Sequence, residues 1–379
     1  MDSKNTHTDL EKQKLRVAIL GARCLPAGYG GTETFTEMLA LGLVNRGHKV
    51  TVYCCAPYQS DRTRIYKGIR RITIPTVRMA ALEKFIYAAI SFMHVCFTNV
   101  DIILMNQIGG GPFCILPRIF GKQVVINPDG LEWKRTKLNW FGAKILKAFE
   151  YISIIWANRI VADSQEIAKY IMTTYRKPAA YIPYGADPDL FQNIDFDLEQ
   201  LNLKSNSYCL QVCRLEPENN AHVVMHEFSS TCTPLSLAIV GSSPFSIKYR
   251  KSLDEIKNSR IHLLGGLYGV KYRALMKNAC IYIHGHEVGG TNPVLLEAMA
   301  AGKCIVALDV PFNREVLADT GLYFTKASGD LASQIDYLAT HPKEIEYFGN
   351  LAKQRASDVF TWGRIIREHE ALFVHMMEK

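Results

Sequence analysis

The segment LRVAILGARCLPAGYGGTETFTEMLALGLVNRGHKVTVYC, residues 15–54, decides the fold class. Its first six residues are typical of a buried β-strand, and a glycine-rich stretch follows at residues 27–31. Apolar residues then recur at helical spacing, at positions 35, 38, 39 and 43, and we expect Thr32 or Thr34 to cap this helix. Residues 49–54 predict a second strand. A strand, a glycine loop, a helix and another strand form a βαβ unit, which implies a parallel sheet.

The same alternation continues along the chain. Further strands are predicted at residues 102–105, 124–126, 160–162 and 180–183, and after a polar, acidic stretch at 208–212, 237–241, 261–265, 281–283 and 304–307. Two α/β series of similar size predict two Rossmann-like domains that face a cleft. We expect the first domain at residues 1–192 and the second at 193–360. The helical segment 361–379 is expected to cross back and join the first domain.

Composition and charge exclude several classes of protein. Of the 379 residues 48% are hydrophobic and 21% are charged, which excludes a disordered chain. The 44 basic and 36 acidic residues give a net charge of +8, which favours anionic partners such as nucleic acid, lipid or phosphorylated small molecules. The ten cysteines have no CxxC spacing, the first 14 residues are polar, and no apolar run reaches the length of a spanning helix. We therefore expect a cytoplasmic protein with reduced thiols.

Three motifs could bind phosphate groups. Gly30 and Gly31 lie at a strand-to-helix turn, where backbone N–H groups can approach an anion. Arg214 follows a predicted strand directly, although it could equally pair with nearby glutamates on the surface. Residues 289–302 combine a loop of small residues with a helix that carries Glu297, which could accept hydrogen bonds from a ribose or simply favour the helix dipole. The glycine spacing matches neither the dinucleotide fingerprint nor a Walker loop, which disfavours a nicotinamide dehydrogenase.

Taken in order along the chain, these motifs resemble those of a known enzyme family. Residues 29–34, 47–52, 181–187, 212–218, 264–265 and 291–302 are similar to the motifs of retaining glycosyltransferases of the GT-B fold, the fourth glycosyltransferase family in the usual classification. Within it, Asp129 to Arg135 and Val288 to Pro293 resemble bacterial rhamnosyltransferases of polysaccharide assembly. This resemblance implies transfer of L-rhamnose from dTDP-L-rhamnose to a saccharide acceptor, with no cofactor and no metal ion.

The resemblance also implies roles for individual residues. It assigns the diphosphate and sugar of the donor to Gly30, Gly31, Arg214, Asn219, Gly290, Thr291 and Asn292, and the ribose to Glu297. Asp129, Glu132 and Arg214 are the expected catalytic residues, with Asp129 at the reacting sugar or the acceptor. The broader family usually has a glutamate where Gly289 stands and a phosphate-binding lysine where Asn219 stands. These two departures indicate either adaptation to the donor or a weakened site.

A basic, tryptophan-containing segment is the candidate for the acceptor or a membrane surface. It comprises Trp133, Lys134, Arg135 and Lys137, followed by a predicted helix at 138–157 that carries Lys144 and Lys147. The helix has an apolar stripe at positions 138, 141, 145, 149, 152 and 156, with the lysines beside it. Such a helix either lies on an anionic membrane, which suits a polyprenyl-linked acceptor, or packs its stripe on the core and exposes a basic edge.

Other functions remain open at this point. The same fold could use UDP-glucose or UDP-galactose, could epimerise a sugar nucleotide, or could bind one as a non-catalytic scaffold. Nucleic-acid binding is disfavoured because no known module is present. His284, His286 and Glu287 are close in sequence, but no further ligand cluster accompanies them, so a metal site is also disfavoured.

Overall fold

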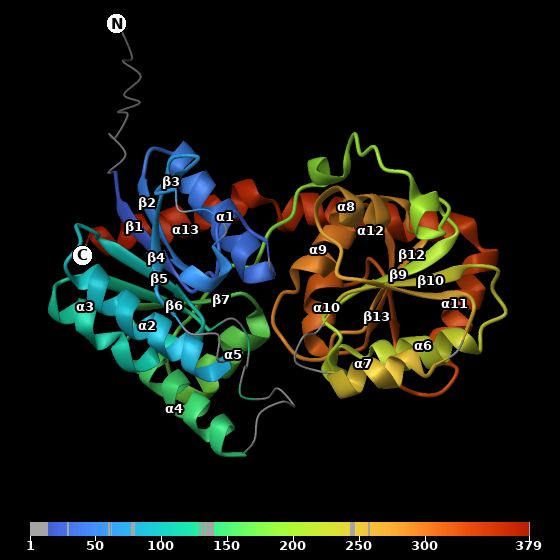
Figure 1. Cartoon of the computed structure of the whole chain (residues 1–379), viewed down its shortest axis with the longest axis horizontal. Coiled ribbons are helices and arrows are strands. Elements are labelled where there is room, and N and C mark those ends of the chain that lie inside the picture. The colour runs from blue at the N-terminus through green and yellow to red at the C-terminus, as the bar shows by residue number, and fades with distance from the viewer. Residues whose placement is uncertain are drawn as a thin grey trace, which may run out of the picture.

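The computed structural model describes residues 14–28, 30–59, 61, 63–76, 80–128, 130, 133, 140–242, 247–256 and 258–378. It has two lobes, each built on its own sheet (Figure 1). Both sheets are parallel except for one edge pair, and helices cover them on both faces. The predicted fold class, two Rossmann-like α/β domains, is confirmed. None of the helices in the described ranges is both long enough and apolar enough to cross a bilayer.

The first sheet has the strand order β3-β4-β2-β1-β5-β6-β7-β8 among the described residues. Its strands are β1 (Arg16–Leu20), β2 (Lys49–Cys55), β3 (Ile65–Tyr66), β4 (Ile69–Ile74), β5 (Ile102–Asn106), β6 (Gln123–Asn127), β7 (Arg159–Ala162) and β8 (Ala180–Tyr181). Its helices are α1 (Gly31–Asn45), α2 (Ala80–Cys96), α3 (Ile115–Ile119), α4 (Trp140–Trp156) and α5 (Gln165–Tyr175). The antiparallel edge strand β3 and its neighbour β4 were not predicted from the sequence.

The second sheet has the order β11-β10-β9-β12-β13-β14. Its strands are β9 (Tyr208–Val212), β10 (Ser236–Val240), β11 (Ile261–Gly265), β12 (Ile281–His284), β13 (Cys304–Leu308) and β14 (Leu322–Phe324). Its helices are α6 (Ala221–Ser229), α7 (Ile247–Asp254), α8 (Gly269–Asn278), α9 (Pro293–Ala300), α10 (Pro311–Leu317), α11 (Asp330–Thr340) and α12 (Pro342–Val359). The short strand β14 was also not predicted.

The last helix, α13 (Trp362–Met377), returns to the first lobe and packs against α1 (Figure 1). Glu370 accepts a hydrogen bond from Arg46 and pairs with His48; Glu370 and His48 are buried, and Arg46 is half-buried. A Cβ on Gly42 would overlap the Ile366 side chain, so α1 and α13 approach closely at a glycine. The predicted crossing of the C-terminal helix is therefore present in the fold.

The strands bury both of their faces, as expected for a doubly covered parallel sheet. In β1, Val17 and Ile19 face the cluster that contains α1 and α13. Ala18 and Leu20 face the cluster that contains Tyr87 and Phe92 of α2. The chain therefore emerges from the carboxyl ends of these strands into the space between the lobes, where open α/β folds place their ligands.

Candidate functional site

Loops at the carboxyl ends of the two sheets meet between the lobes. A Cβ on Gly31, at the start of α1, would lie 2.8 Å from Cγ of Pro293, at the start of α9. A Cβ on Gly130, which follows β6, would lie 3.6 Å from Cα of Gly289. The N-termini of α1 and α9, one from each lobe, therefore converge on the same place. The dipoles of the two helices together favour an anion there.

Asp163, which follows β7 in the first lobe, contacts the same loop of the second lobe. Its carbonyl oxygen accepts a hydrogen bond from the Thr291 hydroxyl, and both residues are buried. A Cβ on Gly290 would lie 2.5 Å from Asp163 Cγ and would overlap the carboxylate oxygens. Only glycine at position 290 therefore allows this approach. The Thr291 hydroxyl holds the two lobes together instead of pointing to a donor phosphate.

A second contact between the lobes involves Glu315 of α10. Its carboxylate accepts hydrogen bonds from the backbone N–H groups of Gln165 and Glu166, at 2.7 and 3.3 Å, at the N-terminus of α5. Burial raises the pKa of Glu315, and the two backbone donors partly offset this. A carboxylate at a helix N-terminus is favourable. Two contacts beside the candidate site therefore hold the lobes together: Thr291 with Asp163, and Glu315 with the start of α5.

The loop after β9 presents Arg214 and buries Asn219. The Arg214 side chain is exposed. The side-chain amide of Asn219 donates to the backbone carbonyl of Arg214 at 2.7 Å, and the backbone carbonyl of Asn219 accepts from the Gln211 side chain. The Asn219 side chain therefore supports the Arg214 loop, and its expected contact with the donor stays a prediction. Arg214 is placed as expected, at the carboxyl end of a strand and accessible to an anion.

Glu297 lies in α9 and is hydrogen-bonded to the Tyr272 hydroxyl. Burial raises the pKa of Glu297, and the tyrosine partly offsets this. Asn292 caps the same helix, because its side chain accepts from the backbone N–H of Val294 at 3.0 Å. Gly289 has a φ of +153°, a conformation that residues with side chains rarely adopt. A glutamate at position 289, which the similar glycosyltransferases usually have, would be strained in this conformation.

His284 and His286 are stacked, with ring centroids 4.4 Å apart. Burial lowers the pKa of both rings, that of His286 to about 3 with a further contribution from Arg214, so both are neutral. No group of three His, Cys, Asp or Glu side chains suited to a metal ion occurs in the part of the chain that the structure describes. The pair is therefore part of the packing behind the Arg214 loop.

Several predicted residues are placed differently or lie outside the described ranges. Asp129, Glu132, Lys134, Arg135 and Lys137 belong to the residues that the structure does not describe. The N-cap of α1 is Gly30, not Thr32 or Thr34, and no side chain caps this end.

Lys147 and Trp133 belong to a cluster around the buried Glu150 of α4. Its carboxylate accepts from Trp133 Nε1 at 3.1 Å and from Lys147 Nζ at 3.0 Å, and it also bonds the hydroxyls of Tyr170 and Tyr175. The Lys147 ammonium lies over the rings of Trp133 and Tyr170. Lys147 therefore faces the protein, contrary to its expected contact with an acceptor or membrane, whereas Lys144 is exposed.

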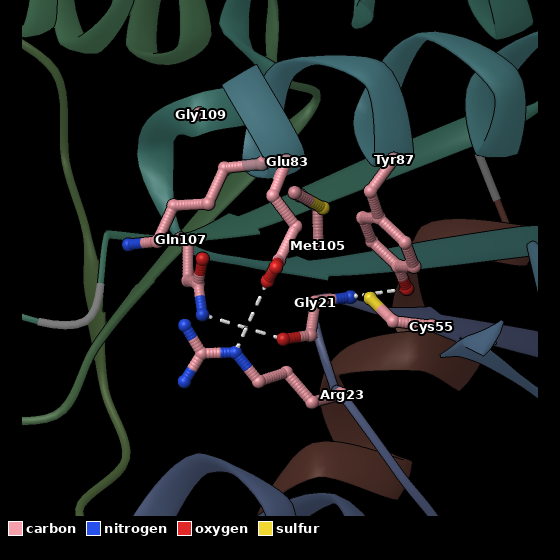
Figure 2. Close-up of a pocket in the computed structure, with 9 residues that line it drawn as sticks. Gly21, Arg23, Cys55, Glu83, Tyr87, Met105, Gln107 and Gly109 are labelled. Atoms are coloured by element: carbon pink, nitrogen blue, oxygen red, sulfur yellow. Dashed lines mark hydrogen bonds and ion pairs between the residues drawn. The ribbon is translucent and has the colours of Figure 1, made fainter. Parts of the chain in front are cut away.

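A polar pocket in the first lobe was not predicted from the sequence (Figure 2). Arg23, directly after β1, is paired with Glu83 of α2 at 3.3 Å, and Gln107, directly after β5, donates to the carbonyl of Gly21. Lys84 also lines the pocket. Asp163 was missed as well. Both Arg23 and Asp163 follow predicted strands, and this was the signal that could have identified them.

Comparisons with known proteins agree with this architecture. Residues 14–187 match the model of a domain of unknown function (DUF1972), and residues 193–355 match that of glycosyl transferases group 1. An uncharacterized glycosyltransferase of Methanocaldococcus jannaschii is 27% identical over 145 residues, and the match spans only 37% of this chain and 37% of that protein.

Solved structures show the same fold over the whole chain. Sucrose-phosphate synthase from Thermosynechococcus elongatus has a TM-score of 0.84 at 17% identity, covering 96% of this chain and 100% of that one. HepE of Anabaena in complex with UDP-glucose has a TM-score of 0.76 at 17% identity, covering 96% and 99%. Starch synthase IV of Arabidopsis thaliana, bound to ADP and acarbose, has a TM-score of 0.78 at 14% identity, covering 97% and 100%. The chain therefore has the two-lobed fold of GT-B glycosyltransferases, with a glycosyl transferases group 1 match in its second lobe.

Proposed function

We propose that this protein is a glycosyltransferase that moves a sugar from a nucleoside diphosphate donor to a saccharide acceptor. The observation that carries the proposal is the convergence of two helix N-termini, those of α1 and α9, between the lobes. Glu297 lies in α9, and Arg214 follows strand β9 of the same lobe. Such a site suits a diphosphate. The match of the second lobe to glycosyl transferases group 1 supports this proposal, as does the UDP-glucose complex of the structurally similar HepE.

The proposed donor is dTDP-L-rhamnose. The support is the resemblance of residues 129–135 and 288–293 to rhamnosyltransferases. The backbone conformation at position 289 also suits the glycine found there. UDP-glucose and UDP-galactose are the competing donors. The proposed acceptor is a saccharide on a polyprenyl lipid, which would place the enzyme at the inner face of the bacterial plasma membrane during surface polysaccharide synthesis.

The proposed chemistry needs neither a metal ion nor a cofactor. The Arg214 guanidinium and the positive ends of the helix dipoles at the starts of α1 and α9 would stabilise the charge that develops on the leaving diphosphate. Glu297 would accept hydrogen bonds from the ribose, with Tyr272 holding its carboxylate in place. Transfer would proceed with retention, and a donor phosphate oxygen would take the acceptor proton on the same face. Asp129 and Glu132 are the proposed groups at the reacting sugar.

The test is a transfer assay with dTDP-L-rhamnose, UDP-glucose and UDP-galactose, a polyprenyl-linked saccharide and its water-soluble analogue. Release of nucleoside diphosphate together with a new α- or β-linkage, read by NMR, identifies the donor and the stereochemistry. We expect retention, and Arg214→Ala should reduce transfer strongly. Donor binding without any transfer by either acceptor would instead favour the scaffold function, for which Asn219 in place of a cation is the specific observation.

A further inference from the structure

Helices α2, α3 and α4 expose an unusual set of large apolar side chains on one side of the first lobe. We call this surface the aromatic face. It consists of Phe85, Met93, Phe97, Ile119, Phe120, Trp140, Phe141, Ile145, Tyr151 and Trp156. Phe97 is 80% exposed and Trp140 is 71% exposed. Single exposed apolar residues are ordinary on a protein surface, but a contiguous group of this kind indicates an interaction site.

Helix α4 exposes more large apolar side chains than is usual for a helix that packs on a core. It buries Glu150 and Ser153 together with Ile154, while Phe141, Ile145 and Tyr151 face outward. The buried carboxylate is satisfied by the tryptophan, lysine and two tyrosines of its cluster. The sequence left open whether the apolar stripe of this helix faces the core or an outside partner. Phe141, Ile145 and Trp156 of that stripe face outward.

Helix α2 has a similar outward ridge. Phe85, Met93 and Phe97 follow one another at spacings of eight and four residues, which keeps them on one side of the helix. Phe85 contacts the rings of Phe113 and of Phe149 in α4, with centroids 5.0 and 6.1 Å apart.

At its other end, the ridge of α2 reaches the end of α3. Phe97 contacts the ring of Phe120, with centroids 5.5 Å apart. In Figure 1 the three helices lie together along the lower left of the first lobe. These contacts join α2 to α3 at one end of the aromatic face and to α4 at the other.

The charges around this face are basic. In residues 80–128 and 140–156, the basic side chains are Lys84, Arg118, Lys122, Lys144 and Lys147, and the acidic ones are Glu83, Asp101 and Glu150. Glu83 and Glu150 are buried, and Asp101 is paired with Arg16. Arg118 and Lys144 are exposed, and the Lys144 ammonium lies over the Trp140 ring. The face thus offers apolar side chains together with positive charge.

We propose that the aromatic face docks onto an anionic lipid bilayer, with α2, α3 and α4 lying in the plane of the membrane. Aromatic side chains that enter the headgroup region, together with neighbouring lysine and arginine, are the features of interfacial binding. An anionic bilayer accounts for both the apolar side chains and the basic charge, whereas a second copy would bring like charges together. The inference extends the proposed function, because it names the surface from which a lipid-linked acceptor would reach the enzyme.

The position of the polar pocket fits this docking. Lys84 lines the pocket, and its neighbour Phe85 belongs to the aromatic face. The pocket of Arg23, Glu83 and Gln107 therefore lies at the end of the aromatic face that the start of α2 forms (Figure 2).

The test is flotation of the full-length protein with vesicles of phosphatidylglycerol and phosphatidylcholine, and with vesicles of phosphatidylcholine alone. Two double variants place acids on the face: Phe97→Glu with Phe120→Glu, and Phe141→Glu with Ile145→Glu. The control is Tyr337→Glu with Tyr347→Glu, two comparably exposed aromatics of the second lobe. We expect binding to the anionic vesicles to weaken at least about tenfold in both face variants and to be unchanged in the control.

Melting temperatures and activity on two acceptors distinguish a failure of membrane docking from a failure of the proposed function. All variants should keep the wild-type melting temperature and their activity on the water-soluble acceptor, while the face variants lose activity on the vesicle-bound acceptor. Wild-type binding by the face variants, equal binding to neutral vesicles, or no binding by the wild type would overturn the inference. Chromatography that finds a dimer dissociated by the same substitutions would assign the face to a second copy and would equally overturn it.

Discussion

The contact between Asp163 and Gly290 gives the sharpest prediction, and the perturbation is Gly290→Ala. The added methyl group would lie 2.5 Å from Asp163 Cγ and would overlap its carboxylate oxygens. Asp163 is 2% exposed, and its carbonyl is held by the Thr291 hydroxyl, so the carboxylate has little room to move. The two residues belong to different lobes. The clash therefore opposes the closed arrangement and leaves each lobe intact.

The size of the effect follows from the cost of overpacking a buried site, which is about 1–3 kcal/mol. Applied to closure of the lobes, this lowers the equilibrium constant for closure by about 5-fold to 150-fold, and kcat/KM for sugar transfer falls by up to the same factor. The melting temperature should change little, because opening relieves the clash. The assay measures nucleoside diphosphate release at varied donor concentration, with thermal unfolding in parallel.

Two variants control this prediction. Gly363→Ala adds a methyl group that meets only the end of the Arg367 side chain, at 3.6 Å, so its activity should equal that of the wild type. Asp163→Ala removes the overlapping atoms, so adding Gly290→Ala to it should cost much less than adding it to the wild type. Wild-type activity of Gly290→Ala, or the same loss in both backgrounds, would refute the closure argument.

Three further predictions concern stability. Because burial raises the pKa of Glu297, its charged form opposes folding, and stability is lost as the pH rises through that pKa. Glu297→Gln should therefore melt at a higher temperature than the wild type near neutral pH, with no such gain in acid. In calorimetry the same variant should bind the donor poorly. Although burial opposes it, bonds from Arg46 and His48 lower the pKa of Glu370; Glu370→Gln should therefore lose about 1–2 kcal/mol in denaturant unfolding near neutral pH, and the loss should disappear as acid protonates the wild-type carboxyl. A Cβ on Gly241, at φ +158°, would overlap the Cys213 carbonyl beside Arg214, so Gly241→Ala should cost about 3 kcal/mol or more, and a wild-type melting curve would contradict this.

The sequence was sufficient for the two α/β lobes because their central strands are buried on both faces and read as apolar runs between helical patterns. The edge strand β3 and its neighbour β4 lack this signal, because β4 alternates buried and exposed residues and includes the basic Arg70 and Arg71. Arg214, Gly290 and Glu297 could be identified because they follow strand ends or open a helix. Their sequence positions fix their place in the fold.

What the sequence could not predict depends on contacts between distant segments. Asp163 is adjacent to Gly290 only after the two lobes meet, and Asn219 is used within its loop through a bond to the Arg214 carbonyl. The outward stripe of α4 was ambiguous because burial of Glu150 requires partners from α5, such as Tyr170, that periodicity does not identify. Side-chain pairing across elements therefore decided the details of the site.

The most direct test of a donor site between the lobes is calorimetric titration with dTDP-L-rhamnose, UDP-glucose, UDP-galactose, UDP-N-acetylglucosamine and GDP-mannose. Wild-type protein is compared with Arg214→Ala and Glu297→Ala, and with Tyr347→Glu as a remote surface control. We expect at least one donor, with dTDP-L-rhamnose foremost, to bind to the wild type and to the control. Both site variants should reduce the affinity for that donor at least about tenfold. Binding that is unaffected by both substitutions, or the absence of binding by every donor, would contradict the account.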